Sequence, residues 1–339
     1  MTLSLQKNKS LKALNTFGFD QRAALYATAK SEQDIEQAVD YARSKNLPLL
    51  VLGEGSNVVL ANDVSGLVLR LTDERIHIDW HNDDVVEVSA SAGVSWHALV
   101  QYTLGNNIQG LENLSLIPGS VGAAPVQNVG AYGVEVQDRI CKVRAFHIPT
   151  RQWLTLRPEQ CQFSYRHSLF KQHADEYIIS EVVFSLGRQH ALQTDYASLA
   201  QHLASRNITR PTAQQISESV IAIRQSKLPD PNVIGNAGSF FHNPIVDAVH
   251  HEALLEQYPE LSSYPQTDGS FKLAAGWLID KLGFKGTVCG GVGVHADQAL
   301  VLVNVGSGTG ADILRLAEKI KTAVRKAYAV ELNIEPRVI

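Results

Sequence analysis

Residues 110–133 constrain the fold of this chain most, because they form a long run rich in glycine, alanine, proline and asparagine. The run is too apolar for a linker, and its glycines and prolines interrupt any single helix or strand. Small residues allow a backbone to lie against a large flat ligand, and the side chains of Gln127 and Asn128 add amide donors and acceptors. We therefore expect this stretch to bind a ligand rather than only to connect two elements.

Two further glycine-rich loops follow apolar runs. Residues 47–52 are expected to form a buried strand that leads into Gly53-Glu54-Gly55-Ser56-Asn57, where Gly55 allows close approach and backbone amides could bind phosphate. A tight turn after a strand explains this loop equally well, and both interpretations stay open. The loop at 306–311 imitates a dinucleotide-binding fingerprint. Only one strand–helix–strand unit fits there before residue 339, so we favour a glycine turn capped by Asp312.

Composition and charge exclude several classes of function. Of the 339 residues, 45% are hydrophobic and 19% are charged, which indicates a folded globular protein of two or three domains. The formal net charge is only −4, so the chain lacks the basic surface expected of a nucleic-acid or membrane-surface protein. Its longest apolar runs, 47–52 and 299–305, are far shorter than the roughly 20 residues that span a bilayer. We expect a cytoplasmic protein that binds neither nucleic acid nor membrane.

The cysteines and histidines show no metal-binding spacing. Cys141, Cys161 and Cys289 are far apart and form no CxxC motif, which predicts free thiols in a reducing compartment and no zinc site. His242 and His295 have no partner at ligand spacing, so we interpret both as structural and expect no metal.

Hydrophobic periodicity predicts alternating strands and helices. A helix should begin at Ser31, because Ile35, Ala38, Val39 and Ala42 recur at helical spacing. By the same reasoning we expect helices at 95–105, 212–227, 270–282 and 312–328. Strands are expected at 47–52, 67–71, 76–80, 85–89, 142–148, 153–156, 177–186 and, as a closing strand, 330–334. This order indicates an α+β or mixed α/β protein.

Several short motifs in a fixed order carry a family resemblance. They are the two glycine-rich stretches, Phe163-Ser164-Tyr165-Arg166, Lys227-Leu228-Pro229-Asp230-Pro231, Gly235-Asn236-Ala237-Gly238-Ser239-Phe240-Phe241-His242-Asn243-Pro244 and Ile334-Glu335-Pro336. Residues 264–266, 272–280 and 294–295 extend the match over nearly the whole chain. The sequence thereby resembles the bacterial UDP-N-acetylenolpyruvoylglucosamine reductases, the MurB family.

The resemblance implies an α+β fold: a two-subdomain FAD-binding module of the vanillyl-alcohol-oxidase (PCMH) type plus a separate α+β substrate-binding domain. The expected parts are the first FAD subdomain at 1–75, the second at 76–207, the substrate domain at 208–322, and a C-terminal strand at 323–339 that returns to the flavin. The implied activity passes hydride from NADPH through FAD to the enolpyruvyl group of UDP-N-acetylglucosamine-enolpyruvate, giving UDP-N-acetylmuramate for peptidoglycan. We expect a monomer.

The resemblance also assigns site residues. Arg166 and Glu335 would stabilise the enolate-like intermediate, and Ser239 would donate the proton. The residues expected to contact FAD are Gly53, Glu54, Gly55, Ser56, Asn57, Ile117, Pro118, Gly119, Ser120, Gly122, Ala123, Gln127, Asn128, Gly130, Ala131, Tyr132 and Arg224. Those expected to contact the substrate are Tyr165, Tyr196, Lys227, Asn243, Tyr264, Lys285 and Gln298, with Tyr196 in the loop that marks the first type of the family.

Each catalytic assignment has a plainer alternative. Ser239 could cap a turn, Arg166 could pair with a surface acid, and Glu335 could be an edge-strand charge. The last segment, Leu332-Asn333-Ile334-Glu335, departs from the commoner family pattern, and a slip of two residues would place Arg337 at the glutamate position.

Two other functions compete with a reductase. The first is a sugar or alcohol oxidase on the same fold, although the first glycine loop lacks the histidine or cysteine that often joins covalently to flavin. The second is a non-catalytic flavin or nucleotide-sugar binding protein, which the serine, arginine and glutamate argue against.

Overall fold

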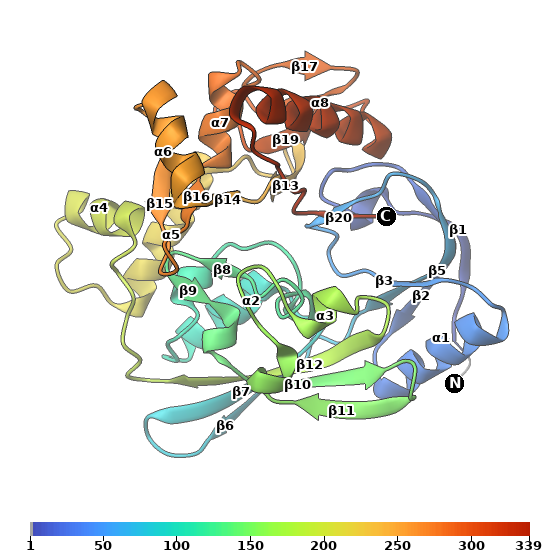
Figure 1. Cartoon of the computed structure of the whole chain (residues 1–339). Helices are drawn as coiled ribbons and strands as arrows, with labels where there is room; N and C mark the ends of the chain where they lie inside the picture. Colours follow the sequence, from blue (N-terminus) through green and yellow to red (C-terminus); the bar gives the residue numbers. More distant parts are fainter. Residues whose placement is uncertain (1–2) are drawn as a thin grey trace. The chain divides into compact units, whose positions relative to one another are not determined.

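The computed structural model describes residues 3–339, and contacts between residues divide the chain into two compact units. Unit 1 comprises residues 3–9, 23–54 and 64–226, and unit 2 comprises residues 10–22, 55–63 and 227–339. Both contain helices and sheets, which confirms the expected α+β class (Figure 1). The four-part division implied by the family resemblance stays a prediction.

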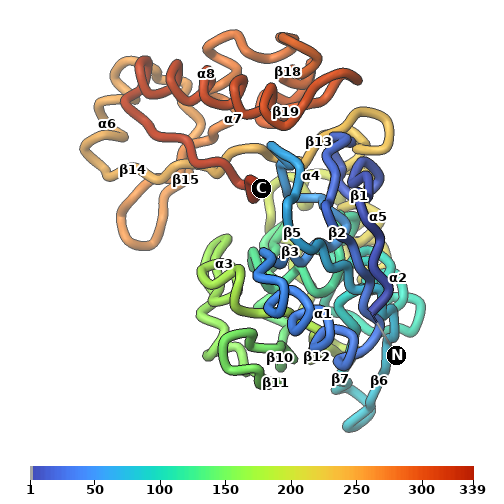
Figure 2. The backbone as a smooth tube through the Cα atoms, turned by 90° about the vertical axis from the view of Figure 1, so that its right-hand side faces the viewer, coloured from blue at the N-terminus to red at the C-terminus, as the bar shows by residue number. Residues whose placement is uncertain are grey.

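The first sheet of unit 1 is built around parallel strands. Its order is β1 (Gln6–Ser10), β2 (Arg22–Ala29), β5 (Val64–Leu71) and β3 (Leu49–Val51), with β2 and β3 both parallel to β5 (Figure 2). Helix α1 (Glu32–Ser44) buries Ile35, Ala38, Val39 and Ala42 in one core with β5. The Ser31 side chain accepts a hydrogen bond from the Asp34 amide at 3.2 Å, so the predicted start of this helix is confirmed.

The second sheet of unit 1 is antiparallel. Its order is β11 (Gln152–Leu156), β10 (Ile140–His147), β12 (Tyr177–Gly187), β7 (Val85–Ser91) and β6 (Ile76–Trp80), which confirms the strands predicted there. Helix α2 (Trp96–Gly105) and the residues after it share the apolar core of this sheet. The other elements of unit 1 are η2 (Glu112–Leu114), η3 (Val121–Ala123), β8 (Gly130–Ala131), β9 (Val134–Glu135), η4 (Val136–Asp138), η5 (Pro158–Cys161), α3 (Leu169–Gln172), α4 (Ala197–Ser205) and α5 (Ala213–Lys227), whose last residue belongs to unit 2.

Unit 2 is built on an antiparallel sheet covered by the long helix α8 (Gly310–Tyr328). The sheet order is β13 (Gly235–Ser239), β19 (Val301–Asn304), β18 (Val292–Val294) and β17 (Val288–Cys289). A smaller sheet has the order β14 (Ile245–Val246), β16 (Phe271–Leu273) and β15 (Ser263–Pro265). The remaining elements are η1 (Lys12–Leu14), α6 (Ala248–Gln257), α7 (Ala275–Lys281) and the parallel pair β4 (Val58–Val59) and β20 (Arg337–Val338).

Two predicted elements were wrong. The helix expected at 270–282 divides into β16 and α7, because Phe271–Leu273 pairs with the neighbouring strands β14 and β15 before the chain turns into a helix. The closing strand expected at 330–334 is reduced to one bridge, between Ile334 and Phe241, and the regular pairing comes later, in β20. No helix among the described residues is long and apolar enough to cross a membrane.

The glycine run at 306–311 leads into α8 as a capped turn. The Thr309 side chain accepts a hydrogen bond from the Asp312 amide, and the Asp312 carboxylate accepts one from the Thr309 amide. The turn that we favoured over a dinucleotide fingerprint is therefore the structure observed, with Asp312 as one half of a capping box.

Candidate active site

The loop at 114–120 in unit 1 is fixed by the first turn of α2. The Trp96 indole N–H donates to the Leu114 carbonyl at 2.8 Å, and the Trp96 amide donates to the Gly119 carbonyl at 2.8 Å. The Leu116 amide donates to the His97 Nδ1 at 3.0 Å. Within the stretch that we expected to bind a ligand, this loop therefore has a defined backbone shape.

The two predicted glycine loops meet in unit 1. The Glu54 carboxylate accepts a hydrogen bond from the Gly119 amide at 3.0 Å. A Cβ atom on Gly53 would lie 2.7 Å from the Ser120 Oγ, which is closer than real Cβ atoms approach a neighbour. The two loops are thus in close contact at Gly53, and a larger residue there would require the Ser120 side chain to turn away.

Several amides on these two loops are left for a ligand. Within residues 3–339, the backbone N–H groups of Gly53, Glu54, Ile117 and Ser120 donate to no protein acceptor. An amide N–H needs an acceptor, and clustered amides of this kind suit phosphate oxygens. The remaining residues of the first glycine loop, 55–57, belong to unit 2, where the Gly55 carbonyl accepts from the Thr16 amide at 3.1 Å.

Arg166 lies at the tip of a tight turn in unit 1. Ser164 and His167 exchange both backbone hydrogen bonds, and Arg166 adopts a left-handed φ of 54° between them. Its guanidinium donates to the Gly130 carbonyl at 3.0 Å. The buried Asn128 amide donates to the Ser164 carbonyl at 3.0 Å. These bonds tie the Arg166 turn to the predicted ligand loop.

Asn128 has a role that the sequence reasoning missed. Besides Ser164, its side-chain amide reaches the Glu135 carboxylate at 2.8 Å, and its oxygen accepts from the Gln137 amide at 3.1 Å. Every polar atom of this buried side chain is thus used inside the protein. Asn128 holds the turn that carries Arg166, and its expected contact with a cofactor stays a prediction.

Tyr132, Tyr196 and Arg224 surround the same loop in unit 1. The Tyr132 and Tyr196 rings meet edge to face at 5.4 Å, and Tyr196 is half exposed. The Arg224 Nε on α5 donates to the Leu116 carbonyl at 3.2 Å. Burial lowers the pKa of Arg224 and raises the pKa of Tyr132. The tyrosine predicted to contact the substrate, Tyr196, is therefore next to Tyr132, which is predicted to contact the cofactor.

In unit 2, Ser239 lies at a bulge in β13. The pairing between β13 and β19 shifts register between Asn236 and Ser239, and Gly238 adopts a φ of +69°. The buried Asn236 side chain holds the bulge, since its oxygen accepts from the Gly238 amide at 2.9 Å and its amide donates to the Pro229 and Ile234 carbonyls. Bulges redirect side chains and are frequent beside active sites.

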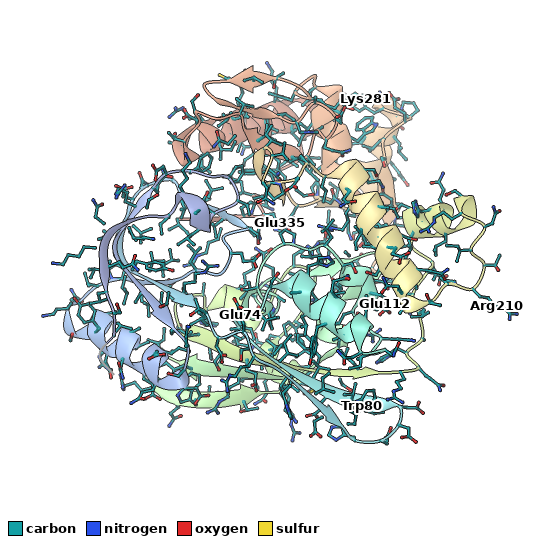
Figure 3. All side chains as sticks on the ribbon, turned by 180° about the vertical axis from the view of Figure 1, so that it is seen from behind. Glu74, Trp80, Glu112, Arg210, Lys281 and Glu335 are labelled. Carbon is teal, nitrogen blue, oxygen red and sulfur yellow. The ribbon has the colours of Figure 1, made fainter. Side chains whose placement is uncertain are left out.

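Glu335, labelled in Figure 3, belongs to the segment that pairs with the residues directly after Ser239. The Glu335 amide donates to the Phe240 carbonyl at 2.9 Å, and the His242 amide donates to the Asn333 carbonyl at 2.9 Å. The residue after Ser239 is thus bonded to Glu335 within one unit. The His242 Nδ1 lies 3.6 Å from the Glu335 carboxylate, so the histidine interpreted as structural contacts the predicted catalytic acid.

The predicted substrate residues divide between the units. Tyr165 and Tyr196 belong to unit 1, and Lys227, Asn243, Tyr264, Lys285 and Gln298 belong to unit 2. Asn243 accepts a hydrogen bond from the Ala275 amide at the start of α7, at 3.0 Å. The Lys285 ammonium pairs with Asp280 at 2.9 Å. Of the three predicted catalytic residues, Ser239 and Glu335 therefore belong to unit 2, and Arg166 belongs to unit 1.

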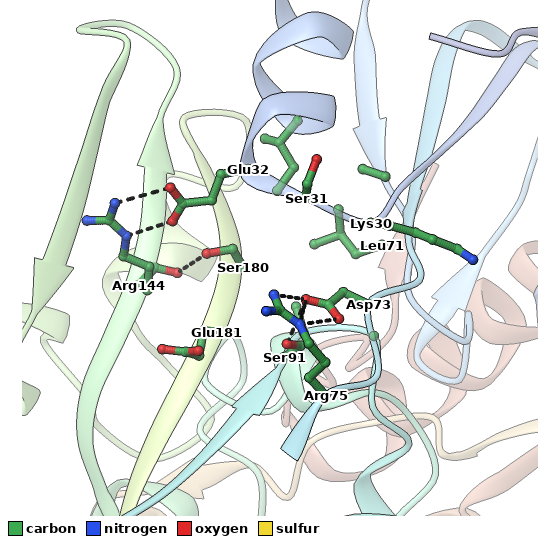
Figure 4. A pocket seen from close by; sticks show the side chains of 14 residues that line it. Lys30, Ser31, Glu32, Leu71, Asp73, Arg75, Ser91, Arg144, Ser180 and Glu181 are labelled. Carbon is green, nitrogen blue, oxygen red and sulfur yellow. Dashed lines mark hydrogen bonds and ion pairs between the residues drawn. The ribbon is translucent and has the colours of Figure 1, made fainter. Parts of the chain in front are cut away.

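A polar cavity of about 150 Å³ lies elsewhere in unit 1, between the end of β2, the start of α1 and the second sheet (Figure 4). Its walls carry two ion pairs, Arg75 with Asp73 at 2.6 Å and Arg144 with Glu32 at 2.9 Å. Among residues 3–339, no group of three or more histidine, cysteine, aspartate or glutamate side chains is arranged to hold a metal.

Comparisons with known proteins identify the class. A family description of an FAD binding domain matches residues 23–154, and one of the UDP-N-acetylenolpyruvoylglucosamine reductase C-terminal domain matches residues 230–339. With the glycine loops of unit 1, these matches define a flavin-dependent oxidoreductase. The protein therefore uses FAD, and the expected combination of an FAD module with a separate α+β domain is confirmed.

The particular family follows from full-length relatives. UDP-N-acetylenolpyruvoylglucosamine reductase of Pseudomonas aeruginosa is 51% identical over 341 residues, covering 100% of each chain, and that of Ralstonia nicotianae is 49% identical over 329 residues, covering 96% of each. The chain belongs to the UDP-N-acetylenolpyruvoylglucosamine reductase (MurB) family. The crystal structure of MurB from Thermus caldophilus shares the fold, with a TM-score of 0.69, 23% identity and 99% of each chain covered.

The residues of unit 1 fit FAD. The amides of Gly53, Glu54, Ile117 and Ser120 donate to no group among the described residues, and the diphosphate of FAD offers acceptors for such donors. Small residues on both loops leave the backbone open to a flat ring system. The loops that would hold the cofactor are therefore the two that stood out in the sequence.

Proposed function

We propose that this protein reduces the enolpyruvyl group of UDP-N-acetylglucosamine-enolpyruvate to UDP-N-acetylmuramate, using FAD and NADPH, in peptidoglycan precursor synthesis. The observation that carries the proposal is the hydrogen-bonded pairing of residues 240–242 with 333–335, directly after Ser239. It supports a proton donor and a carboxylate that act at one place, as the reaction requires. The full-length similarity to proteins named for this reductase supports the substrate.

FAD, held by the two glycine-rich loops of unit 1, would supply the hydride chemistry by which NADPH reduces the enol-ether carbon remote from the carboxylate. Negative charge then builds on the enolpyruvyl group of the substrate. Arg166 would bind that carboxylate, because a planar guanidinium matches its two oxygens. Losing one preorganised donor of this kind typically costs about 2.7–4 kcal/mol of transition-state stabilisation.

Ser239 would donate its Oγ proton to the substrate carbon next to the carboxylate. A serine hydroxyl is a weak acid, so this step needs a strongly basic, carbanion-like acceptor and a neighbouring charge or water that returns the proton. The Glu335 carboxylate lies on the segment bonded to the serine strand, with His242 beside it at 3.6 Å, and we assign it, together with Arg166, to stabilising the enolate-like intermediate. The bulge held by Asn236 would set the direction of the Ser239 side chain.

The nucleotide end of the substrate would bind mainly to unit 2. Lys227 and Lys285 suit the diphosphate, and the amides of Asn243 and Gln298 suit the uracil edge. Tyr264 and Tyr196 are both half exposed and would cover the diphosphate. NADPH would occupy the same site as the substrate, in turn, and the final residues, 323–339, would bring Glu335 to the flavin.

NADPH consumption by the purified yellow protein tests the proposal. We expect rapid oxidation of NADPH only when UDP-N-acetylglucosamine-enolpyruvate is present, with UDP-N-acetylmuramate as the product, and slower oxidation of NADH. A flavin that NADPH reduces but that only oxygen reoxidises would support the oxidase alternative. A protein that binds FAD and the nucleotide sugar without turnover would support the non-catalytic alternative.

A further inference from the structure

The peptide groups of Leu116 are held from two sides in unit 1. On one side the Leu116 amide donates to the His97 Nδ1 at 3.0 Å, and on the other the Leu116 carbonyl accepts from the Arg224 Nε at 3.2 Å. Leu116 itself has a φ of 57°, in the left-handed region that leucine rarely adopts. Two side chains from different helices thus stabilise one unfavourable backbone conformation.

The conformation of Leu116 determines where the backbone amides of the following residues point. Leu116 directly precedes Ile117, and the amides of Ile117 and Ser120 donate to no acceptor among residues 3–339. A change of φ at Leu116 would rotate the chain that carries these two donors. The Trp96 bonds to Leu114 and Gly119 hold both flanks of the segment, and within residues 3–339 only His97 and Arg224 bond to its strained residue.

The bond also fixes the form of the histidine. An amide can only donate, so His97 Nδ1 must carry a lone pair and the ring proton must be on Nε2. An imidazolium has N–H groups at both positions and cannot accept the Leu116 bond. Arg224 approaches the same residue with a positive charge, which opposes a second charge on His97.

We propose that His97 is a positioning residue for the flavin: its neutral Nδ1 fixes the Leu116 peptide and thereby presents the Ile117 and Ser120 amides as donors for FAD. The proposal rests on the FAD binding that the family membership supports and does not depend on the substrate or on NADPH. It concerns the hold on the cofactor rather than the chemical step.

The surroundings of His97 keep it neutral at physiological pH. Burial lowers its pKa below the ordinary 6.5, and the charge of Arg224 lowers it further. Tyr132 and Arg166 are the other titratable or charged groups that act on Arg224, and Arg166 adds a second positive charge. The Leu116 bond should therefore persist at neutral pH and be lost only as the pH falls through the lowered pKa of His97.

The test measures the affinity of the apoprotein for FAD by quenching of flavin fluorescence, from about pH 8 to about pH 5. His97→Leu removes the acceptor and leaves the Leu116 amide unsatisfied, so we expect FAD binding to weaken about tenfold at neutral pH. His97→Asn offers an oxygen near the position of Nδ1 and should bind within about threefold of the unsubstituted protein. The matched control is His190→Leu, which replaces another half-buried histidine of unit 1 with a lowered pKa.

The pH dependence separates positioning from packing. The unsubstituted protein should lose FAD affinity as the pH falls through the lowered pKa of His97, whereas His97→Asn should lose less, since its amide does not titrate. Unchanged affinity in His97→Leu, equal losses in His97→Leu and His97→Asn, or an equal loss in His190→Leu would each overturn the proposal. Identical pH profiles for the unsubstituted protein and His97→Asn across the titration of His97 would overturn it as well. If His97→Leu does not fold, the comparison with His97→Asn across the pH range still decides.

Discussion

The 114–120 loop of unit 1 and the 235–242 segment of unit 2 are held in different ways. The loop depends on side chains from neighbouring helices, since Trp96, His97 and Arg224 each bond to its backbone. The segment depends mainly on backbone pairing, with β19 on one side and residues 333–335 on the other. Asn236 is the one side chain we identify as shaping it, by holding the bulge.

Because the loop and the segment are held differently, they should respond differently to side-chain substitutions. A loop fixed by side chains can be loosened by single substitutions that never touch a ligand. A segment fixed by backbone pairing tolerates most side-chain changes, because the bonds that hold it do not involve side chains. We therefore expect cofactor binding to respond to substitutions around the loop, and catalysis to respond chiefly to Ser239 itself.

Ser239→Ala gives the largest expected effect and tests the segment at its reacting side chain. Loss of the proton donor should lower turnover by about 10²–10⁴-fold, the usual contribution of a positioned general acid. The flavin absorbance and the melting temperature should stay close to those of the unsubstituted protein. Ser205→Ala, on the exposed end of α4, is the control. Full turnover in Ser239→Ala would refute the assigned proton donor.

Asn128→Ala sharpens the comparison in unit 1. The substitution leaves the Gln137 amide and the Ser164 carbonyl without a buried partner, so we expect a loss of about 3 kcal/mol in the free energy of unfolding. Because the Arg166 turn loses its anchor, KM for the enol ether should rise as well. Denaturant titration and steady-state kinetics measure the two effects, with Asn106→Ala as a control that breaks one exposed hydrogen bond. A normal KM in a destabilised protein would show that Asn128 does not position Arg166 for the substrate.

Asn236→Ala tests whether the 235–242 segment is held by backbone pairing alone, because Asn236 is the side chain that supports it. We expect the free energy of unfolding to fall by about 2 kcal/mol, since a buried amide with three hydrogen bonds is lost. Turnover should fall while FAD content is retained. If turnover stays normal, the pairing with β19 and residues 333–335 positions Ser239 without the bulge contact.

The ion pair of Asp73 and Arg75 should give the smallest effect, because it lies outside both segments. The Arg75 guanidinium, followed by the Ser91 hydroxyl, holds the pKa of Asp73 below its ordinary 3.8, against the opposing effect of burial (Figure 4). A lowered carboxyl pKa stabilises the fold above the ordinary value, and this stabilisation is lost as the pH falls through the lowered one. Asp73→Asn should cost less than about 1 kcal/mol at neutral pH, since Arg75 is largely in water. The difference from the unsubstituted protein should shrink below about pH 4, as measured by denaturant titration.

Much of the architecture could be predicted from local patterns. Ile35, Ala38, Val39 and Ala42 recur at helical spacing, and in the structure they form the buried face of α1. The 270–282 segment shows the limit, because its first residues pair with strands β14 and β15, which are distant or weakly patterned in the sequence. Helix α6 was not predicted, because only two of its described residues, His251 and Leu254, are buried and two residues give no helical periodicity.

The sequence by itself determined the family, the order of the elements and the two loops suited to FAD, because these depend on residue types and on neighbours close along the chain. Tertiary structure decided the rest. The strained Leu116 is held by His97 and Arg224, which lie 19 residues before it and 108 residues after it. Ser239 and the residues directly after it pair with residues 300–301 and 333–335. No periodicity encodes such contacts, because they form only when distant segments pack and each buried polar group needs a partner.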